Sequence, residues 1–245
     1  KMDYKLNRTL KRLGHKEFEE DIKGFIKNTH KFYSSKIPEI KTLARKLHDE
    51  HSLEEFYKVF NKLWKSGYHN ERVLAIKTLK LYKDDFDLDT WYAIKFKLKD
   101  IKDWDEIDEV SQNIVGNLIL KFDSVKKDVF NLSKKRDAYL RRMALVSSLP
   151  LIKEKDFDFS INLLEYYAFN KQEKIQEAVG LVLKEISKIN KVVGKKLILK
   201  YINMKDIAFN IATENMRDLR KVRKLKGLEE GKSNFDKKGL FSWLR

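Results

Sequence analysis

The chain contains no cysteine, two prolines and nine glycines in 245 residues. The absence of cysteine excludes disulfides, thiolate metal sites and a cysteine nucleophile. Because proline and glycine are scarce, few residues interrupt helices, and Leu, Ile, Lys and Glu are abundant instead. The composition therefore favours an all-α protein over a strand-rich one.

Sequence signals for several common kinds of site are also missing. The five histidines have no consistent metal-ligand spacing, and His48 and His51 lack evident carboxylate support. There is no glycine-rich phosphate loop, and no order of Ser, His and Asp suggests a catalytic triad. The sequence therefore predicts neither a metal nor a cofactor.

Long apolar runs are absent as well. No run approaches the roughly 20 apolar residues that a membrane span needs. The first residues, Lys1 to Lys5, lack the apolar core of a signal peptide. We therefore expect no membrane association and a cytoplasmic location.

Positive charge is in clear excess. Lys and Arg number 53 against 37 Asp and Glu, which gives a formal net charge of +16. Such an excess attracts polyanions, so nucleic acid is the first candidate partner. A compositional bias toward lysine and glutamate is the alternative explanation.

Apolar residues recur at helical spacing along the chain. In residues 171–188, Ile175, Val179, Val182 and Ile186 follow one another at three- and four-residue steps, which predicts the buried stripe of an amphipathic helix. Further helices are expected near residues 16–30, 38–46, 69–83, 87–98, 104–121, 124–133, 137–149, 156–169, 191–202 and 205–225.

The helices are closely spaced. Ser52 and Glu55 form a capping-box signature, which predicts the start of one more helix. About a dozen helices with tight links suggest stacked antiparallel pairs near the roughly 40-residue period of HEAT-type repeats. We predict an all-α, HEAT-like helical-repeat solenoid with a concave basic face, and a helical bundle is the alternative. Residues 1–226 are expected to form one domain, and residues 227–245 a flexible basic tail.

Residues 103–108, Asp-Trp-Asp-Glu-Ile-Asp, form an acidic and aromatic segment in this basic chain. On a helix, Trp104 and Asp108 lie one turn apart on the same face. Taken alone, Trp104 is explained by packing on a neighbouring helix and Asp108 by a solvated position in an acidic helix start. The alternative is chemistry on a nucleic acid, because a carboxylate on a surface that should attract polyanions needs a reason.

Five segments occur together in a characteristic order: residues 32–41, 63–75, 104–108, 139–144 and 175–185. They include Trp104 and Asp108, and the Arg-Arg pair in Tyr-Leu-Arg-Arg-Met-Ala. Over roughly residues 15–215 the chain resembles the AlkD-type DNA alkylation repair glycosylases, a family of HEAT-like helical repeats. The resemblance implies a prokaryotic monomer that binds double-stranded DNA at the nucleoid and hydrolyses the N-glycosidic bond of cationic alkylated purines.

The resemblance also implies roles for particular residues. Asp108 would be the catalytic carboxylate, which stabilises positive charge on the sugar. Trp104 and Leu181 would contact the lesion and its deoxyribose. Arg142, Lys184 and Lys41 would bind DNA phosphates.

The chain departs from the family pattern at four positions, and one of them is Ser34, where the family usually has glycine. Leu181 and Tyr139 stand where the family normally has tryptophan, and Lys184 stands where it has arginine. Leu181 lies off the predicted buried stripe, on a face with Glu177 and Lys184, so we expect it to line the same surface. The departures leave two alternatives open, a non-catalytic protein that binds damaged, bent or branched DNA, and a helical-repeat adaptor that binds proteins.

Overall fold

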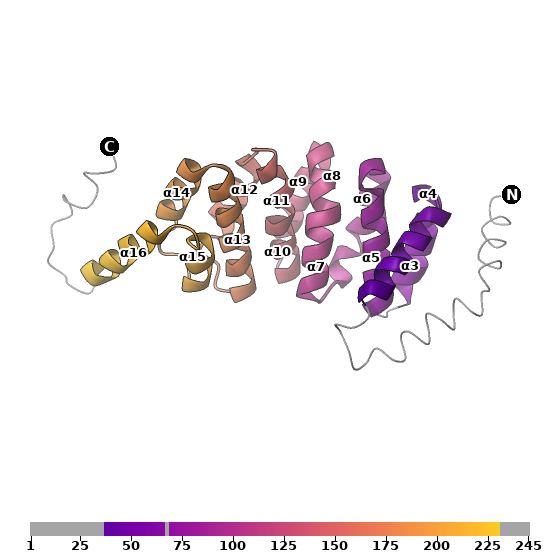
Figure 1. The fold of residues 1–245 in the computed structure, drawn as a ribbon, viewed down its shortest axis with the longest axis horizontal. Coiled ribbons are helices and arrows are strands. Elements are labelled where there is room, and N and C mark those ends of the chain that lie inside the picture. The colour runs from indigo at the N-terminus through magenta and orange to yellow at the C-terminus, as the bar shows by residue number, and fades with distance from the viewer. Residues whose placement is uncertain (1–36, 67–68, 231–245) are drawn as a thin grey trace. The chain divides into compact units, whose positions relative to one another are not determined.

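The structure is a computed structural model that describes residues 37–66 and 69–230 (Figure 1). All regular secondary structure within these residues is helical, which confirms the all-α prediction. The chain divides into two compact units, Lys1–Lys121 and Phe122–Arg245, here called unit 1 and unit 2. None of the helices in the described ranges is long and apolar enough to cross a membrane.

Unit 1 is organised around one central helix. Its described elements are α3 (Ile37–Glu50), α4 (Leu53–Lys65), α5 (His69–Leu79), the 3-10 helix η1 (Lys80–Asp85), α6 (Leu88–Lys95), the 3-10 helix η2 (Leu98–Asp100), α7 (Trp104–Val110), the π-helix η3 (Ser111–Val115) and α8 (Gly116–Lys121). Helix α5 packs against α3, α4, η1 and α7. The position of α7, which carries the candidate site, therefore depends on α5.

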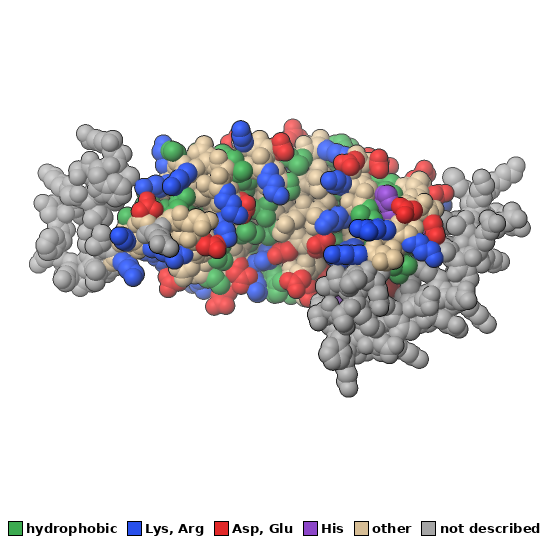
Figure 2. Space-filling model, in the orientation of Figure 1, with side chains coloured by type: hydrophobic (Ala, Val, Ile, Leu, Met, Phe, Trp, Pro, Cys, Tyr) green, Lys and Arg blue, Asp and Glu red, His purple; other side chains and the backbone are tan. Residues whose placement is uncertain are grey.

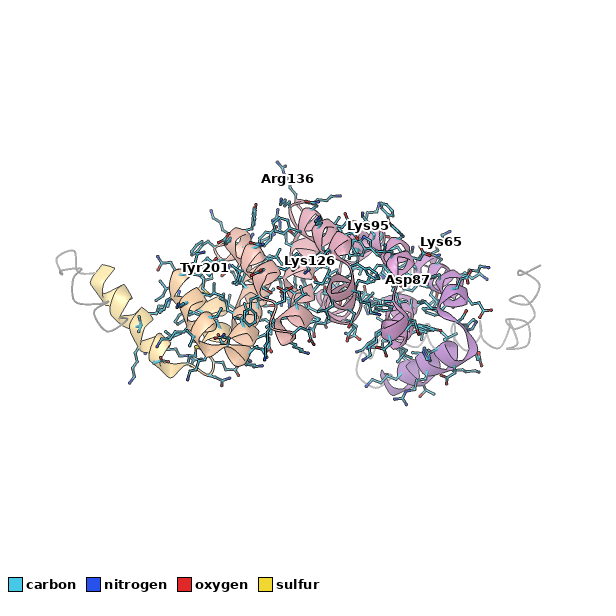
Figure 3. The ribbon with its side chains drawn as sticks, turned by 90° about the horizontal axis from the view of Figure 1, so that it is seen from above. Lys65, Asp87, Lys95, Lys126, Arg136 and Tyr201 are labelled. Carbon is cyan, nitrogen blue, oxygen red and sulfur yellow. The ribbon has the colours of Figure 1, made fainter. Side chains whose placement is uncertain are left out.

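Local signals in the sequence set the ends of these helices. The predicted capping box is present, because Ser52 accepts a hydrogen bond from the Glu55 N–H and Glu55 accepts one from the Ser52 N–H. Helices α4 and α6 end on Lys65 and Lys95, labelled in Figure 3, whose charges complement the C-terminal ends of the helix dipoles. The fully buried Trp91 of α6 belongs to the core of unit 1.

Unit 2 is organised around its longest helix. Its described elements are α9 (Asp123–Ser133), α10 (Ala138–Ser147), α11 (Leu149–Lys153), α12 (Asp158–Tyr167), α13 (Glu173–Ile189), α14 (Lys191–Lys200), α15 (Asp206–Ala212) and α16 (Arg217–Glu230). Helix α13 packs against α10, α11, α12, α14 and α15. The predicted stripe of α13 is confirmed, since Ile175, Val179, Val182 and Ile186 are all fully buried.

A glycine permits the close approach of α13 and α15. A Cβ atom on Gly180 would lie 2.7 Å from the carbonyl oxygen of Ala208 and 2.8 Å from the Cβ of Ile211. Both neighbours belong to α15, and one of them is backbone, so a larger residue would push the helices apart. Gly180 therefore has a packing role on α13, one residue before Leu181.

The C-terminal part differs from the predicted helix pattern. The single helix expected over residues 205–225 is wrong, because α15 ends at Ala212 and α16 begins at Arg217. The intervening turn is closed by a 2.9 Å hydrogen bond from the Met216 N–H to the Thr213 carbonyl, and it allows the side chain of Met216 to be buried. Such a turn was hidden in the sequence by the helix-forming residues on both sides.

The last described helix extends beyond the predicted domain boundary at residue 226. Helix α16 continues to Glu230, so the chain is still helical at Gly227, where the tail was expected to begin. A glycine costs a helix only about 1 kcal/mol relative to alanine, which is too little to end it. The remainder of the expected tail, residues 231–245, and the expected helix at 16–30 lie outside the described residues. The single domain over 1–226 stays a prediction.

Charged side chains of both signs lie on each unit. On the face drawn in Figure 2, Lys and Arg are interspersed with Asp and Glu. Arg136, at the turn between α9 and α10, is exposed and points away from the ribbon (Figure 3). The concave basic face stays a prediction.

Candidate nucleic-acid site

Helix α7 presents the two most informative residues of the sequence together. Asp103 caps the helix, because its side chain accepts a 2.9 Å hydrogen bond from the Glu106 N–H. The cap starts α7 at Trp104 and places Trp104 and Asp108 about 40° apart around the helix axis. Both side chains are half-buried. The predicted arrangement of an aromatic ring and a carboxylate on one face is therefore present.

The opposite side of α7 carries a buried carboxylate. Glu106 is 3 % exposed, and one of its oxygens, Oε1, lies 2.5 Å from Nδ1 of His69. Its other oxygen, Oε2, lies 3.4 Å from the guanidinium of Arg72. The hydrogen bond to Glu106 raises the pKa of His69 above its ordinary value, while burial of the ring acts in the opposite direction. We call His69, Arg72 and Glu106 the α5–α7 cluster.

A second carboxylate of α7 also meets cations. Glu109 Oε1 lies 3.6 Å from the ammonium of Lys77 on α5 and 3.3 Å from that of Lys80 on η1. These pairs are half-exposed, so each contributes little by itself. These pairs and the α5–α7 cluster show that cationic side chains of α5 and η1 form ion pairs with the acidic residues of α7 that face them.

A π-helical turn follows α7 directly. The predicted helix over residues 104–121 exists, but residues Ser111–Val115 are wound as a π-helix. The side chains of Ser111 and Asn113 donate hydrogen bonds to the carbonyls of Ile107 and Glu109, four residues earlier. Single π-turns inside helices occur frequently at functional sites. No periodicity signal in the sequence revealed this turn.

The predicted phosphate ligand Arg142 lies inside unit 2. Arg142 lies one turn after the start of α10, which Asp137 caps. It is only 8 % exposed. Its Nη1 donates a hydrogen bond to the Lys174 carbonyl and lies 3.3 Å from Oε2 of Glu177. Lys174 pairs with the same Glu177, at 2.9 Å. Arg142 is therefore held against the first turns of α13.

Leu181 and Lys184 follow Glu177 on the same face of α13. Leu181 is half-buried, in contrast to the fully buried stripe, which agrees with its predicted place away from the core. Lys184 forms an ion pair with Glu214. The hydrogen bond from Lys184 lowers the pKa of Glu214 below its ordinary value. The face formed by Glu177, Leu181 and Lys184 lies beside Arg142, which reaches Glu177.

The structure thus gathers the predicted residues into two groups. Unit 1 contains Trp104 and Asp108 on α7, and Lys41, which is exposed on α3. Unit 2 contains Arg142 on α10, and Leu181 and Lys184 on α13. The roles assigned to these residues stay predictions. Among the described residues no group of three or more His, Asp or Glu is arranged to hold a metal ion.

Sequence reasoning missed the charged partners of the site residues. A histidine and an arginine three residues apart at a helix start, facing a glutamate on a later helix, give no local pattern. The acidic start of α7 was visible, but it did not distinguish the inward Glu106 from the half-buried Asp108. The partner of Arg142 was likewise not foreseen.

Comparisons with known proteins place this arrangement in a family. The family model described as DNA alkylation repair enzyme matches residues 6–216, which is most of the chain. The chain belongs to this family. A solved structure of a predicted DNA alkylation repair enzyme from Enterococcus faecalis is similar, with a TM-score of 0.62 and 19 % sequence identity.

That likeness covers 72 % of this chain and 82 % of the Enterococcus faecalis chain, and at this identity it shows a shared fold. A comparison with curated protein sequences found no match. The fold and the family therefore agree with the prediction made from the five segments.

Proposed function

We propose that this protein is a monofunctional DNA glycosylase, which hydrolyses the N-glycosidic bond of cationic alkylated purines of the 3-methyladenine and 7-methylguanine type in double-stranded DNA. The observation that carries the proposal is the pairing of Trp104 and Asp108 on one face of α7, in a member of the DNA alkylation repair enzyme family. The proposal includes action as a monomer at the nucleoid, without a metal or cofactor.

The proposed reaction needs little acid catalysis. A purine alkylated at N3 or N7 is already cationic, so it leaves as a neutral base when the electron pair of the glycosidic bond moves to its ring nitrogen. The sugar acquires oxocarbenium character as that bond breaks. An ionised Asp108 stabilises this developing charge and orients the water that attacks C1′, and the water proton is released to solvent.

Trp104 supports the same transition state from one helical turn away. Its indole face can lie against the deoxyribose or the cationic base. Such a cation–π contact contributes about 0.5–2 kcal/mol. The capped start of α7 fixes the spacing between the ring and the carboxylate, so both act on one nucleotide.

The proposed phosphate contacts differ in how accessible they are. Lys41 is exposed on α3. Arg142 and Lys184 are paired with Glu177 and Glu214, so a phosphate must replace or share a carboxylate at each position. Exchange of one anionic partner for another conserves most of the electrostatic energy, which makes both residues suitable for phosphates.

The test is release of methylated purines from methylated duplex DNA. We expect wild type to release 7-methylguanine or 3-methyladenine, and Asp108→Asn to release it about 100-fold or more slowly. Asp105→Asn is the matched control, because it removes the same charge from an exposed position on the same helix and should retain wild-type release. Equal background release from wild type and Asp108→Asn contradicts the proposal.

A non-catalytic DNA-binding protein is the second candidate. Two observations favour it. Leu181 is aliphatic where the family normally has tryptophan, and Arg142 is paired with Glu177. In that case wild type binds damaged, bent or branched duplexes with a strong salt dependence but releases no base. Asp108→Asn would then leave binding unchanged or tighten it.

A further inference from the structure

The most deeply buried charged side chain among the described residues lies on the helix that carries the proposed catalytic carboxylate. Glu106 is 3 % exposed, less than His51 and Arg142. Burial of a carboxylate is costly unless cations and hydrogen bonds compensate it. The compensation here comes from His69 and Arg72, which both belong to the first turn of α5.

The direction of Glu106 relates it to the site. It follows Trp104 by two residues and precedes Asp108 by two, so it lies about 200° around the helix from each of them. The residue that anchors α7 to unit 1 therefore points directly away from the face that would meet DNA. Two contacts from one turn of α5, one to each carboxylate oxygen, restrict both the rotation and the depth of α7.

We infer that Glu106 is a positioning residue and that the α5–α7 cluster holds Trp104 and Asp108 in the orientation that glycosidic bond cleavage requires. The inference rests on the proposed glycosylase function. Glu106 does not touch the substrate, and it acts through the backbone of α7. A displacement of about 1 Å at a reacting group can reduce a rate roughly 100-fold, so the anchor matters even though it is remote from the reaction.

His69 gives the anchor a measurable signature. Its ring is half-buried, and the charged groups around it are Glu106, Asp103 and Arg72. The two carboxylates favour the protonated ring and Arg72 opposes it. The anchor is strongest while His69 is charged, so the rate of base release should fall as pH rises through the titration of His69.

The experiment measures single-turnover release of 7-methylguanine from a methylated duplex between pH 6 and 8.5, corrected for release without enzyme. We expect Glu106→Gln to lower the rate at least about tenfold while DNA affinity, from fluorescence anisotropy, stays at the wild-type value. His69→Asn should release base more slowly at low pH and should lose the fall of rate with pH. Glu109→Gln is the matched control, because it removes another carboxylate of α7 that faces cations of α5 and η1, and it should behave as wild type.

The outcomes separate the two proposals. If wild type and Asp108→Asn both release base only at the rate seen without enzyme, the glycosylase function is wrong, and if both release it equally above that rate, Asp108 is not the catalytic carboxylate. If Asp108→Asn is inactive but Glu106→Gln and His69→Asn both keep the wild-type rate and pH profile, only the positioning role is wrong. If Glu106→Gln does not fold, the half-exposed His69→Asn decides, and a wild-type rate and pH profile in that variant overturns the inference.

Discussion

Within the part of the chain that the structure describes, each unit buries a charged residue next to its predicted site, and the two residues have different roles. In unit 1 the buried charge is Glu106, and the predicted site residues Trp104 and Asp108 lie on the other side of the same helix. In unit 2 the buried charge is Arg142, which is itself a predicted site residue. In unit 1 the buried ion-paired residue and the proposed catalytic residue are different side chains. In unit 2 Arg142 is both the buried ion-paired residue and a proposed phosphate ligand.

This difference has consequences for substitutions. A change at Glu106 alters stability and geometry without removing any group that would touch DNA. A change at Arg142 removes an internal partner of Glu177 and a proposed phosphate ligand together. Experiments on unit 2 therefore need a way to separate the two effects, and the partner Glu177 provides it.

The largest expected effect is the loss of stability on removal of the unit 1 anchor. Glu106→Ala leaves the half-buried Arg72 without its carboxylate, and loss of one partner of a pair costs up to about 3–5 kcal/mol when the remaining charge is fully buried. Chemical denaturation followed by circular dichroism measures this change. A loss below about 1 kcal/mol would show that the pairs contribute little to the stability of α7.

Unit 2 should show the next largest effect, in DNA affinity. Arg142→Gln should weaken binding to duplex DNA roughly tenfold, because a charge-assisted hydrogen bond to phosphate is lost. Glu177→Gln should strengthen binding several-fold, because it removes the carboxylate that competes for Arg142. Binding measured over a range of salt concentrations should show a slope smaller by about one for Arg142→Gln.

The matched control for this pair is Glu173→Gln, an exposed change of the same charge in the first turn of α13. Stronger binding by Glu173→Gln to the same extent as by Glu177→Gln would show that only net charge matters. Unchanged DNA binding by Arg142→Gln would show that Arg142 only pairs with Glu177 inside unit 2 and does not bind phosphate. The buried charge would then have the same internal role in both units.

A smaller effect should appear in the pH dependence of stability. The pKa of His69 is raised in the folded state, chiefly by the hydrogen bond to Glu106. Its contribution is therefore fully present below the ordinary value of about 6.5 and is lost as pH rises through the raised value. The free energy of unfolding of wild type should fall across this window. In His69→Asn that fall should be absent, and a retained fall would assign it to another group.

Much of the fold was predictable because it depends on the spacing of residues that are close together in the sequence. The stripe of α13 and the capping box at Ser52 follow from spacing alone. The helical segment from Trp104 onward was also predictable, but its π-helical turn was not. The pairing of Trp104 with Asp108 was predictable for the same reason, since both residues are on one helix. The break between α15 and α16 was not, because burial of Met216 depends on tertiary packing.

The partners of the site residues were unpredictable for a related physical reason. Glu106 contacts residues 34 and more positions earlier, and Arg142 contacts residues 32 to 35 positions later, on different helices. Which carboxylate of an acidic helix start turns inward depends on the rotation of that helix. That rotation is fixed by its packing on α5, which the sequence of α7 does not contain.

The smallest expected effect concerns the exposed pair of Lys184 and Glu214 in unit 2. Glu214→Gln should leave stability unchanged, because an ion pair at the surface is screened by water and salt. It should tighten DNA binding only slightly, about twofold, if Lys184 meets a phosphate. Glu165→Gln is the control, since Glu165 of α12 pairs with Lys200 of α14 in a more exposed ion pair of the same unit. A tightening equal to that of the control would remove Lys184 from the DNA contact and leave Arg142 as the phosphate ligand that unit 2 contributes.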